Sequence, residues 1–159
     1  MSKAIPAEHD ALIPHLVCER CGDAIEFYKK AFGATEVNRT LAPDGKRVMH
    51  AEIRIGGKPL FLNDDFPEFC GGKAANPKAL GGTPVTIHRY VEDCDAAIQR
   101  AADAGATVRM PPMDMFWGDR YGMVVDPFGH QWSIATHQHD LTPQQIEKNM
   151  KEAFAHAHA

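Results

Sequence analysis

Hydrophobic and polar residues follow the same order twice along this chain. Each half opens with a short apolar run, and a segment with the helical spacing of apolar residues follows it. Three further runs alternate in the manner of β-strands and are separated by short turns. The order spans about residues 11–66 and again about residues 84–137. The pattern therefore predicts two copies of one βαβββ unit.

The two copies correspond most clearly at their helices. The strand LIPHLV precedes the helical segment DAIEFYKKAFG in the first half, and VTIHRYV precedes DAAIQRAADAG in the second. We expect Asp23 and Asp95 to be the N-caps of these helices and Gly33 and Gly105 to end them. Both glycines are followed by the dipeptide Ala-Thr, which supports an ancient duplication of one unit.

These elements predict a single α+β domain over residues 1–159, with two tandem βαβββ modules that form a curved mixed sheet around a cleft. A connector rich in Gly and Pro, at about residues 67–83, joins the modules. A C-terminal helix is expected at about residues 142–156. Its start carries the capping-box pattern of Thr142, Pro143 and Gln145.

Composition and charge narrow the class of protein. The 159 residues are 44% hydrophobic and 24% charged, which is ordinary for a globular chain. A net charge of -4 argues against nucleic acid or an anionic membrane as a partner. The chain has no apolar run long enough for a transmembrane helix, and its first residues lack the apolar stretch of a signal peptide. We expect a cytoplasmic protein.

The cysteines favour a structural role. Cys18 and Cys21 form a C-x-x-C pair, which could be a redox pair or half of a zinc site. No second C-x-x-C follows, and Cys70 and Cys94 lie far away in the sequence. We interpret all four as reduced thiols.

Four stretches carry a resemblance to a known family: IPHLVCERCGDAIEFYKKAFGA, RVMHAEIRIGGKPLFLND, VTIHRYVEDCDA and GDRYGMVVDPFGHQWSIATH. They are similar to the vicinal oxygen chelate superfamily, which includes glyoxalase I, extradiol dioxygenases and bleomycin-resistance proteins. The resemblance covers about residues 11–137 and is strongest to a bacterial glyoxalase-like branch. It implies paired βαβββ modules, a homodimer, and a cleft that holds a small organic molecule.

The resemblance also locates the positions where metal-dependent members carry their ligands. A glutamate is expected four residues after the last glycine turn of each module, where this chain has Leu60 and Ser133. A first-strand ligand falls near Thr86 in the second module, and the first module offers His15. The usual carboxylate ligands are therefore missing, and we expect no cofactor beyond a possible divalent metal.

The resemblance and the alternation of strand residues predict which side chains face the cleft. On the other side of the strands, His130 and Trp132 are expected to point away from the cleft, while Asp126 and Gly129 set the turn before them. The predicted cleft residues are His15, His50, Glu52, His88, Tyr90, Tyr121 and Met123.

The segment MPPMDMFWGDRYG, at about residues 110–122, is expected to be a loop with an apolar surface. Phe116 and Trp117 suit the edge of a ligand pocket, a dimer interface, or ordinary core. Arg120 either forms an ion pair with Asp119 or grips an acidic group of a ligand.

The leading interpretation is a protein that binds a small organic molecule without the usual metal set. The alternative is a metal-dependent lyase, isomerase or dioxygenase whose ligands come from His15, His50, Glu52 and His88. In an enzyme, His50 or Glu52 could instead act as the general base. A partner-protein module is a third interpretation, which rests only on the Met and aromatic segment.

Overall fold

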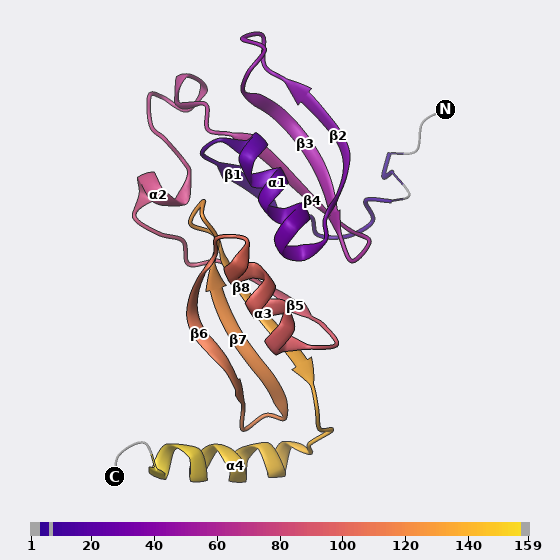
Figure 1. Cartoon of the computed structure of the whole chain (residues 1–159), viewed down its shortest axis with the longest axis vertical. Helices are drawn as coiled ribbons and strands as arrows, with labels where there is room; N and C mark the ends of the chain where they lie inside the picture. Colours follow the sequence, from indigo (N-terminus) through magenta and orange to yellow (C-terminus); the bar gives the residue numbers. More distant parts are fainter. Residues whose placement is uncertain (1–3, 7, 157–159) are drawn as a thin grey trace. The chain divides into compact units, whose positions relative to one another are not determined.

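The computed structural model describes residues 4–6 and 8–156. The chain forms two compact units (Figure 1). The first unit extends to Thr83 and also includes the segment Pro127–His130. The second unit begins at Pro84, continues to Asp126, and resumes at Gln131. Each unit contains one four-stranded sheet.

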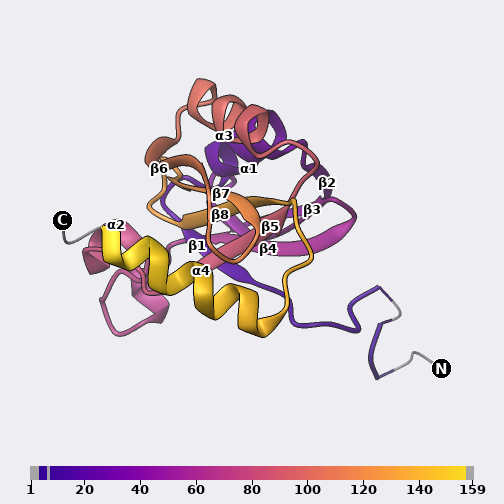
Figure 2. The same ribbon diagram turned by 90° about the horizontal axis from the view of Figure 1, so that it is seen from below.

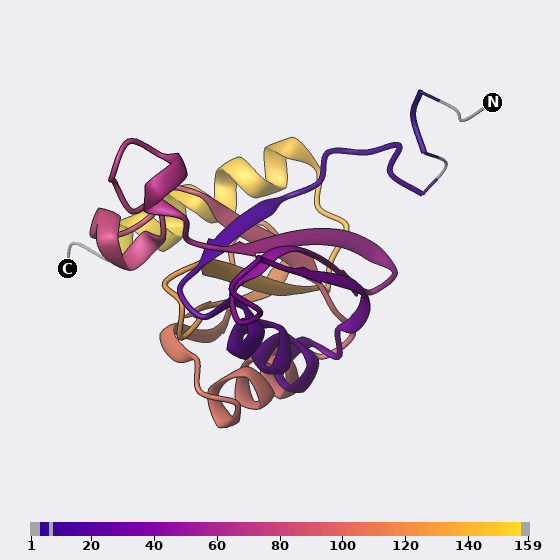
Figure 3. The same cartoon turned by 90° about the horizontal axis from the view of Figure 1, so that it is seen from above.

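The sheet of the first unit has the strand order β1-β4-β3-β2. β1 pairs with β4 in parallel, and the other neighbours are antiparallel. Helix α1 connects β1 to β2 and packs on one face of this sheet (Figure 3). The elements are β1 (His15–Cys18), α1 (Cys21–Phe32), β2 (Thr35–Leu41), β3 (Val48–Ile55) and β4 (Lys58–Asp64).

The sheet of the second unit repeats this topology, with the order β5-β8-β7-β6 and β5 parallel to β8. Helix α3 covers one face (Figure 2), and α4 lies on the opposite side near the ends of the strands, where it contacts the turn between β6 and β7. The prediction of two βαβββ modules and a C-terminal helix is confirmed. The elements are β5 (Thr86–Tyr90), α3 (Cys94–Asp103), β6 (Thr107–Asp114), β7 (Asp119–Val125), β8 (Gln131–His137) and α4 (Pro143–His156).

The connector between Asp64 and Thr86 is not purely loop, because it contains the short helices η1 (Pro67–Phe69) and α2 (Pro77–Leu80). Among the residues that the structure describes, no helix is long and apolar enough to cross a bilayer.

The helix ends differ from the prediction at their N-termini. α1 begins after Arg20, which adopts a left-handed conformation with φ of 61°, so Asp23 lies inside the first turn. α3 is capped by Asp93, whose side chain accepts a hydrogen bond from the backbone N–H of Ala96, and Asp95 again lies in the first turn. Gly33 ends α1 in the left-handed conformation, as predicted, whereas the C-cap of α3 is Ala104, one residue before Gly105.

The capping box of α4 is confirmed. Thr142 Oγ1 accepts a hydrogen bond from the backbone N–H of Gln145, and Gln145 Oε1 accepts one from the backbone N–H of Thr142. The two bonds satisfy donors that have no partner inside the helix.

The turn between β7 and β8 is structural, as the sequence indicated. Asp126 Oδ2 accepts a hydrogen bond from the buried indole of Trp132 at 3.0 Å. Gly129 has φ of 94°, and a Cβ there would approach Pro77 Cβ to 2.9 Å, so glycine is required. His130 is buried and donates from Nε2 to the carbonyl oxygen of Val17.

The thiols of Cys18, Cys21 and Cys94 are free and buried, and Cys70 is free and exposed. Burial, reinforced by the negative charge of Asp64, raises the pKa of the Cys21 thiol to about 12. The Cys21 thiol is therefore protonated at neutral pH and a poor nucleophile. This agrees with the interpretation of the C-x-x-C pair as structural.

Asp64 links three elements of the first unit. Its buried carboxylate accepts hydrogen bonds from the backbone N–H of Cys21 at the start of α1 and of Val48 at the start of β3, at 2.9 and 2.7 Å. Replacing Asp64 with alanine leaves both donors without their acceptor inside the protein.

We predict that Asp64→Ala lowers the free energy of unfolding by roughly 3 kcal/mol, because each lost bond involved a charged acceptor. Urea denaturation measures this change. Asp44→Ala is the matched control, since Asp44 also accepts two backbone N–H groups but is exposed to water. Equal losses in the two variants would contradict the role assigned to burial.

Candidate functional site

The strand register of the second unit places most of the predicted cleft residues on one face of its sheet. His88 lies opposite Ser133, which lies opposite Met123, and Tyr90 and Tyr121 flank Ala135 in the same way. Alternate residues, such as the buried Trp132 and Ile134, face α3 instead. We call the face away from α3 the uncovered face of the second sheet.

Aromatic rings form a continuous row across this face. The His88 ring centroid lies 4.7 Å from that of Tyr90 and 6.1 Å from that of Tyr121, to which it is nearly parallel. Tyr121 lies 5.6 Å from Trp117, and Trp117 lies 4.9 Å from Phe116, both in edge-to-face contact. We call these five side chains the aromatic row.

Asp119 fixes two rings of the aromatic row, Tyr90 at one end and Trp117 toward the other. Its side chain is 5% exposed, and Oδ2 accepts hydrogen bonds from Tyr90 Oη at 2.9 Å and Trp117 Nε1 at 3.1 Å. Oδ1 accepts a third from His137 Nδ1 at 2.8 Å. Burial alone raises the pKa of Asp119, but the bonds from His137, Tyr90 and Trp117 together hold the pKa below its ordinary value.

His137 bridges two carboxylates. Its Nδ1 faces Asp119, and its Nε2 lies 2.9 Å from Oδ1 of Asp140, which is fully exposed in the segment between β8 and α4. The hydrogen bonds to Asp140 and Asp119 raise the pKa of His137 above 6.5. Only the imidazolium can donate from both nitrogens at once, so this geometry suits the charged ring.

A shallow hollow of about 540 Å³ adjoins His137 on the same unit. Its walls are one ring of the aromatic row and residues at the ends of β5 and β8. The lining residues are Tyr90, Val91, Glu92, Thr136 and His137.

The sequence interpretation missed Asp119 and His137 as site residues. His137 follows Ser133 by four residues on β8, so strand alternation alone places it on the uncovered face. The sequence offered an ion pair between Asp119 and Arg120 as one of two alternatives for Arg120, and the structure does not form it. Arg120 points toward α3, where it pairs with Asp95 at 2.8 Å and with Asp114 at 3.1 Å.

The Met and aromatic segment is not a loop, contrary to the prediction. β6 extends through Met113 to Asp114, and only the turn before β7 is irregular. Phe116 in this turn supports α4, because its carbonyl oxygen accepts a hydrogen bond from Asn149 and its ring lies 6.4 Å from that of Phe154.

The uncovered face of the first sheet is lined by imidazoles. His15 lies opposite Phe61, whose ring centroid is 5.9 Å from that of His15, 4.9 Å from that of His50 and 5.5 Å from that of His9. Burial and the nearby His50 lower the pKa of His15, so His15 is neutral at pH 7. His9 lies in the segment before β1 and was not predicted to take part.

Glu52 shares this face with His50 but is already paired. Its Oε2 accepts a hydrogen bond from His9 Nε2 at 3.0 Å, and its Oε1 lies 3.1 Å from Nη2 of Arg54. Both carboxylate oxygens therefore have protein partners, and the side chain is 5% exposed.

The donor set does not fit the metal site that the family resemblance implies. Leu60 lies on the face covered by α1, and Phe61 occupies the position on β4 that corresponds to Ser133 on β8. Neither position offers a carboxylate. Within residues 4–6 and 8–156, no three His, Cys, Asp or Glu side chains are grouped closely enough to hold a metal ion.

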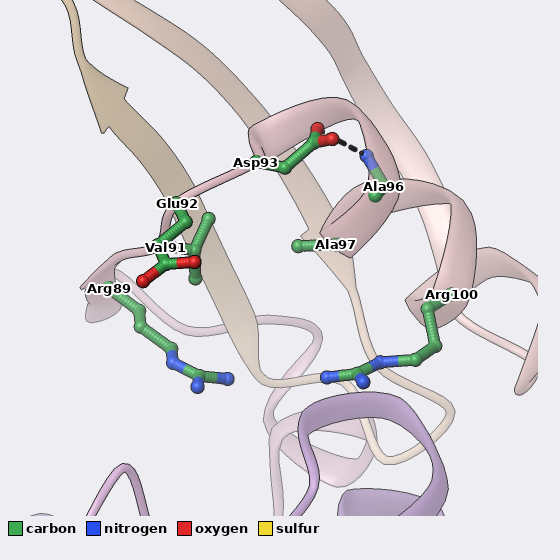
Figure 4. A pocket seen from close by; sticks show the side chains of 7 residues that line it. All are labelled: Arg89, Val91, Glu92, Asp93, Ala96, Ala97 and Arg100. Carbon is green, nitrogen blue, oxygen red and sulfur yellow. Dashed lines mark hydrogen bonds between the residues drawn. The ribbon is translucent and has the colours of Figure 1, made fainter.

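A second hollow, of about 490 Å³, lies beside α3, and the guanidinium groups of Arg89 and Arg100 point toward each other across it (Figure 4). Burial, with the like charge of Arg100, lowers the pKa of Arg89. Neither arginine is free of other interactions, and Asp93 caps α3. The lining residues are Arg89, Val91, Glu92, Asp93, Ala96, Ala97 and Arg100. We therefore place the candidate site on the uncovered face instead.

We predict that the native pKa of His137, measured by NMR titration, lies above 6.5 and falls in Asp140→Asn. Because the folded-state pKa is raised, the contribution of His137 to stability is complete below its ordinary pKa of 6.5 and is lost as pH rises through the higher pKa of the folded state.

The free energy of unfolding should therefore favour wild type over His137→Gln more at about pH 5.5 than at about pH 9. His139→Gln, in the same exposed segment, is the control for a histidine that does not bond Asp119 or Asp140. A native pKa of His137 at or below 6.5 would contradict the bridging arrangement.

Comparison with known proteins places this geometry in a family. The family described as the glyoxalase/bleomycin resistance protein/dioxygenase superfamily matches residues 12–134. The Mycobacterium tuberculosis protein named "Uncharacterized protein Rv0887c" is 52% identical over 140 residues, which cover 88% of this chain and 82% of that protein. Protein YjdN of Escherichia coli is 27% identical over 133 residues, which cover 72% of this chain and 86% of that protein.

Two solved structures share the fold of this chain. The gene product At5g48480 of Arabidopsis thaliana has a TM-score of 0.61 and 30% identity, covering 79% of this chain and 97% of that one. TioX from Micromonospora sp. ML1 has a TM-score of 0.62 and 26% identity, covering 80% of this chain and 98% of that one. The chain belongs to the glyoxalase/bleomycin resistance protein/dioxygenase superfamily.

Proposed function

We propose that the protein binds a small, flat organic molecule against the aromatic row of the second sheet, without the metal set found in metal-dependent members of the family. The observation that carries this proposal is the row itself, with five rings in contact and a buried carboxylate that holds two of them, Tyr90 and Trp117.

The physical basis is complementarity to a planar apolar ligand. Tyrosine and tryptophan rings offer large, stiff surfaces on which another ring can stack or pack edge to face. Tyr90 is 58% exposed, so at least one end of the row is accessible to a ligand. Ligand sites of this kind combine apolar walls with a few fixed polar groups.

Polar groups along the row would orient the ligand. His88 Nδ1 and Ser133 Oγ share a hydrogen bond of 2.7 Å near the middle of the sheet. Tyr90 Oη and Trp117 Nε1 are both committed to Asp119, which leaves their rings positioned before a ligand arrives. Such preorganisation reduces the conformational entropy that binding would otherwise cost.

The remaining predicted ligand contacts stay predictions. His15 and His50 present imidazole edges on the first sheet, while Glu52 is held by two neighbours and is less available to a ligand. Arg120 forms ion pairs with Asp95 and Asp114 on the α3 side of the sheet. A homodimer also stays a prediction.

We predict that 6-nitrobenzotriazole, a flat bicyclic probe, quenches the fluorescence of Trp117 in a saturable manner that excess EDTA does not change. The chain has two tryptophans, so Trp132→Phe isolates the signal of Trp117, and Trp117→Phe isolates that of Trp132 on the other face.

Tyr121→Ala should weaken binding about tenfold, because it removes the central ring of the row, a contact of about 1 kcal/mol or more. Val108→Ala, on the opposite face of the same sheet, should leave affinity unchanged. Loss of binding on chelation, or equal effects of the two substitutions, would overturn the proposal.

A further inference from the structure

The contacts of His137 set it apart from the other histidines on the uncovered faces. It combines a buried carboxylate behind one ring nitrogen, an exposed carboxylate in front of the other, and an adjoining hollow. Histidine with a carboxylate at Nδ1 is an arrangement that directs the opposite nitrogen toward proton transfer.

We propose that His137 is a general base that removes a proton from a small aromatic substrate in the hollow beside Tyr90, with Asp119 as its positioning residue and Asp140 as a displaceable cover. The inference rests on the proposed binding face, and it adds chemistry to that face. The substrate class is an aromatic molecule with an acidic C–H or O–H group.

Asp119 determines which nitrogen of His137 becomes the base. The carboxylate is buried, negatively charged and already holds Tyr90 and Trp117, so losing its third donor would be costly. Neutral His137 therefore keeps its proton on Nδ1. The lone pair is then on Nε2, the nitrogen that faces Asp140.

Asp140 accepts a hydrogen bond from Nε2 of His137 only while the imidazole ring is charged. When Nε2 loses its proton, a lone pair and a carboxylate face each other at 2.9 Å without a hydrogen between them. Both are acceptors, so the contact becomes repulsive, and the fully exposed Asp140 side chain can rotate into water. The backbone need not move, because the N–H groups of Gln138 and His139 remain bonded to the carbonyl of Gly118.

The groups around Nε2 are consistent with a proton-transfer site. The charged and titratable residues around His137 are Asp119 on β7 and Asp140 after β8, which contact its ring, and Tyr90 on β5 and Glu92 after β5, which line the same hollow. Hydrogen bonding to Asp119 raises the pKa of Tyr90, so its hydroxyl stays protonated as a donor and does not compete as a base. Three of these four groups are carboxylates. Their negative charge stabilises the imidazolium that forms when His137 accepts a proton.

The proton balance of the step is simple. The bond between the substrate atom and its hydrogen breaks, the proton moves to Nε2, and the electron pair stays with the substrate. His137 becomes the imidazolium, donates again to Asp140, and releases the proton to water. The step requires no oxidant, reductant or further reactant.

The test uses 5-nitrobenzisoxazole, whose decomposition requires only a base. Removal of the ring C–H proton drives cleavage of the N–O bond and releases 2-cyano-4-nitrophenolate, which absorbance detects. Wild type should exceed His137→Gln by about 100-fold in kcat/KM, the scale expected for a positioned base. His139→Gln is the matched control and should equal wild type, because His139 is a nearby exposed histidine outside the hollow.

Two further variants test whether Asp119 and Asp140 act on the His137 ring or only stabilise the fold. The measurement is the pH profile of kcat/KM. Asp140→Asn should shift the profile to lower pH and raise the rate near neutrality, since a neutral amide stabilises the imidazolium less than a carboxylate does. Asp119→Asn should also shift the profile to lower pH while lowering the plateau, because the ring loses its fixed tautomer. A purely structural Asp119 would lower the plateau without moving the profile.

Binding of 6-nitrobenzotriazole, followed in parallel, distinguishes the two proposals. Intact binding with equal turnover in wild type and His137→Gln overturns the general base and leaves the proposed binding function standing. Absence of both binding and turnover overturns both. Turnover that depends on His137, with the pH shift in Asp140→Asn, supports the base.

Discussion

One constraint organises each unit: a single helix covers one face of a four-stranded sheet and leaves the other face to different partners. Because side chains alternate along a strand, every strand must supply apolar residues to one side and suitable residues to the other. On the helix side, residues such as Ile53, Leu62, Val124 and Ile134 are fully buried. On the other side, polar and aromatic residues gather, and those residues are what the protein has available for function.

The buried carboxylates on the two uncovered faces have different hydrogen-bond partners. On the second sheet, Asp119 satisfies three donors from three different segments and thereby orders the aromatic row. On the first sheet, Glu52 is satisfied by His9 and Arg54. Within the part of the chain that the structure describes, no buried side-chain nitrogen or oxygen lacks a hydrogen-bond partner. This agrees with the high cost of burying an unpaired polar group.

Membership in the superfamily establishes the fold but not the chemistry, because function depends on the site residues. Phe61 and Ser133 stand at the corresponding strand positions of the two sheets, opposite His15 and His88. A phenyl ring and a hydroxyl cannot replace carboxylate ligands. At positions where the family resemblance implies carboxylate ligands, this chain therefore presents a phenyl ring and a hydroxyl.

The sequence by itself determined the features that depend on local spacing. The duplicated βαβββ order and the capping box at Thr142 follow from short-range patterns in the printed chain. Strand alternation places His88 and Tyr90 on one face of β5, but the prediction that this face lines a cleft also used the family resemblance. The N-caps were displaced by two or three residues, because Arg20 and Asp93 take backbone conformations that composition alone does not fix.

Only the tertiary structure decided which side chains meet. The strand order β5-β8-β7 brings Tyr90, His137 and Asp119 together although they are far apart in the sequence, and the same order turns Arg120 toward Asp95. Likewise, Glu52 is paired with His9, 43 residues away. The physical reason is that a hydrogen bond requires two atoms within about 3 Å, and sequence periodicity specifies the face of a residue but not its partner.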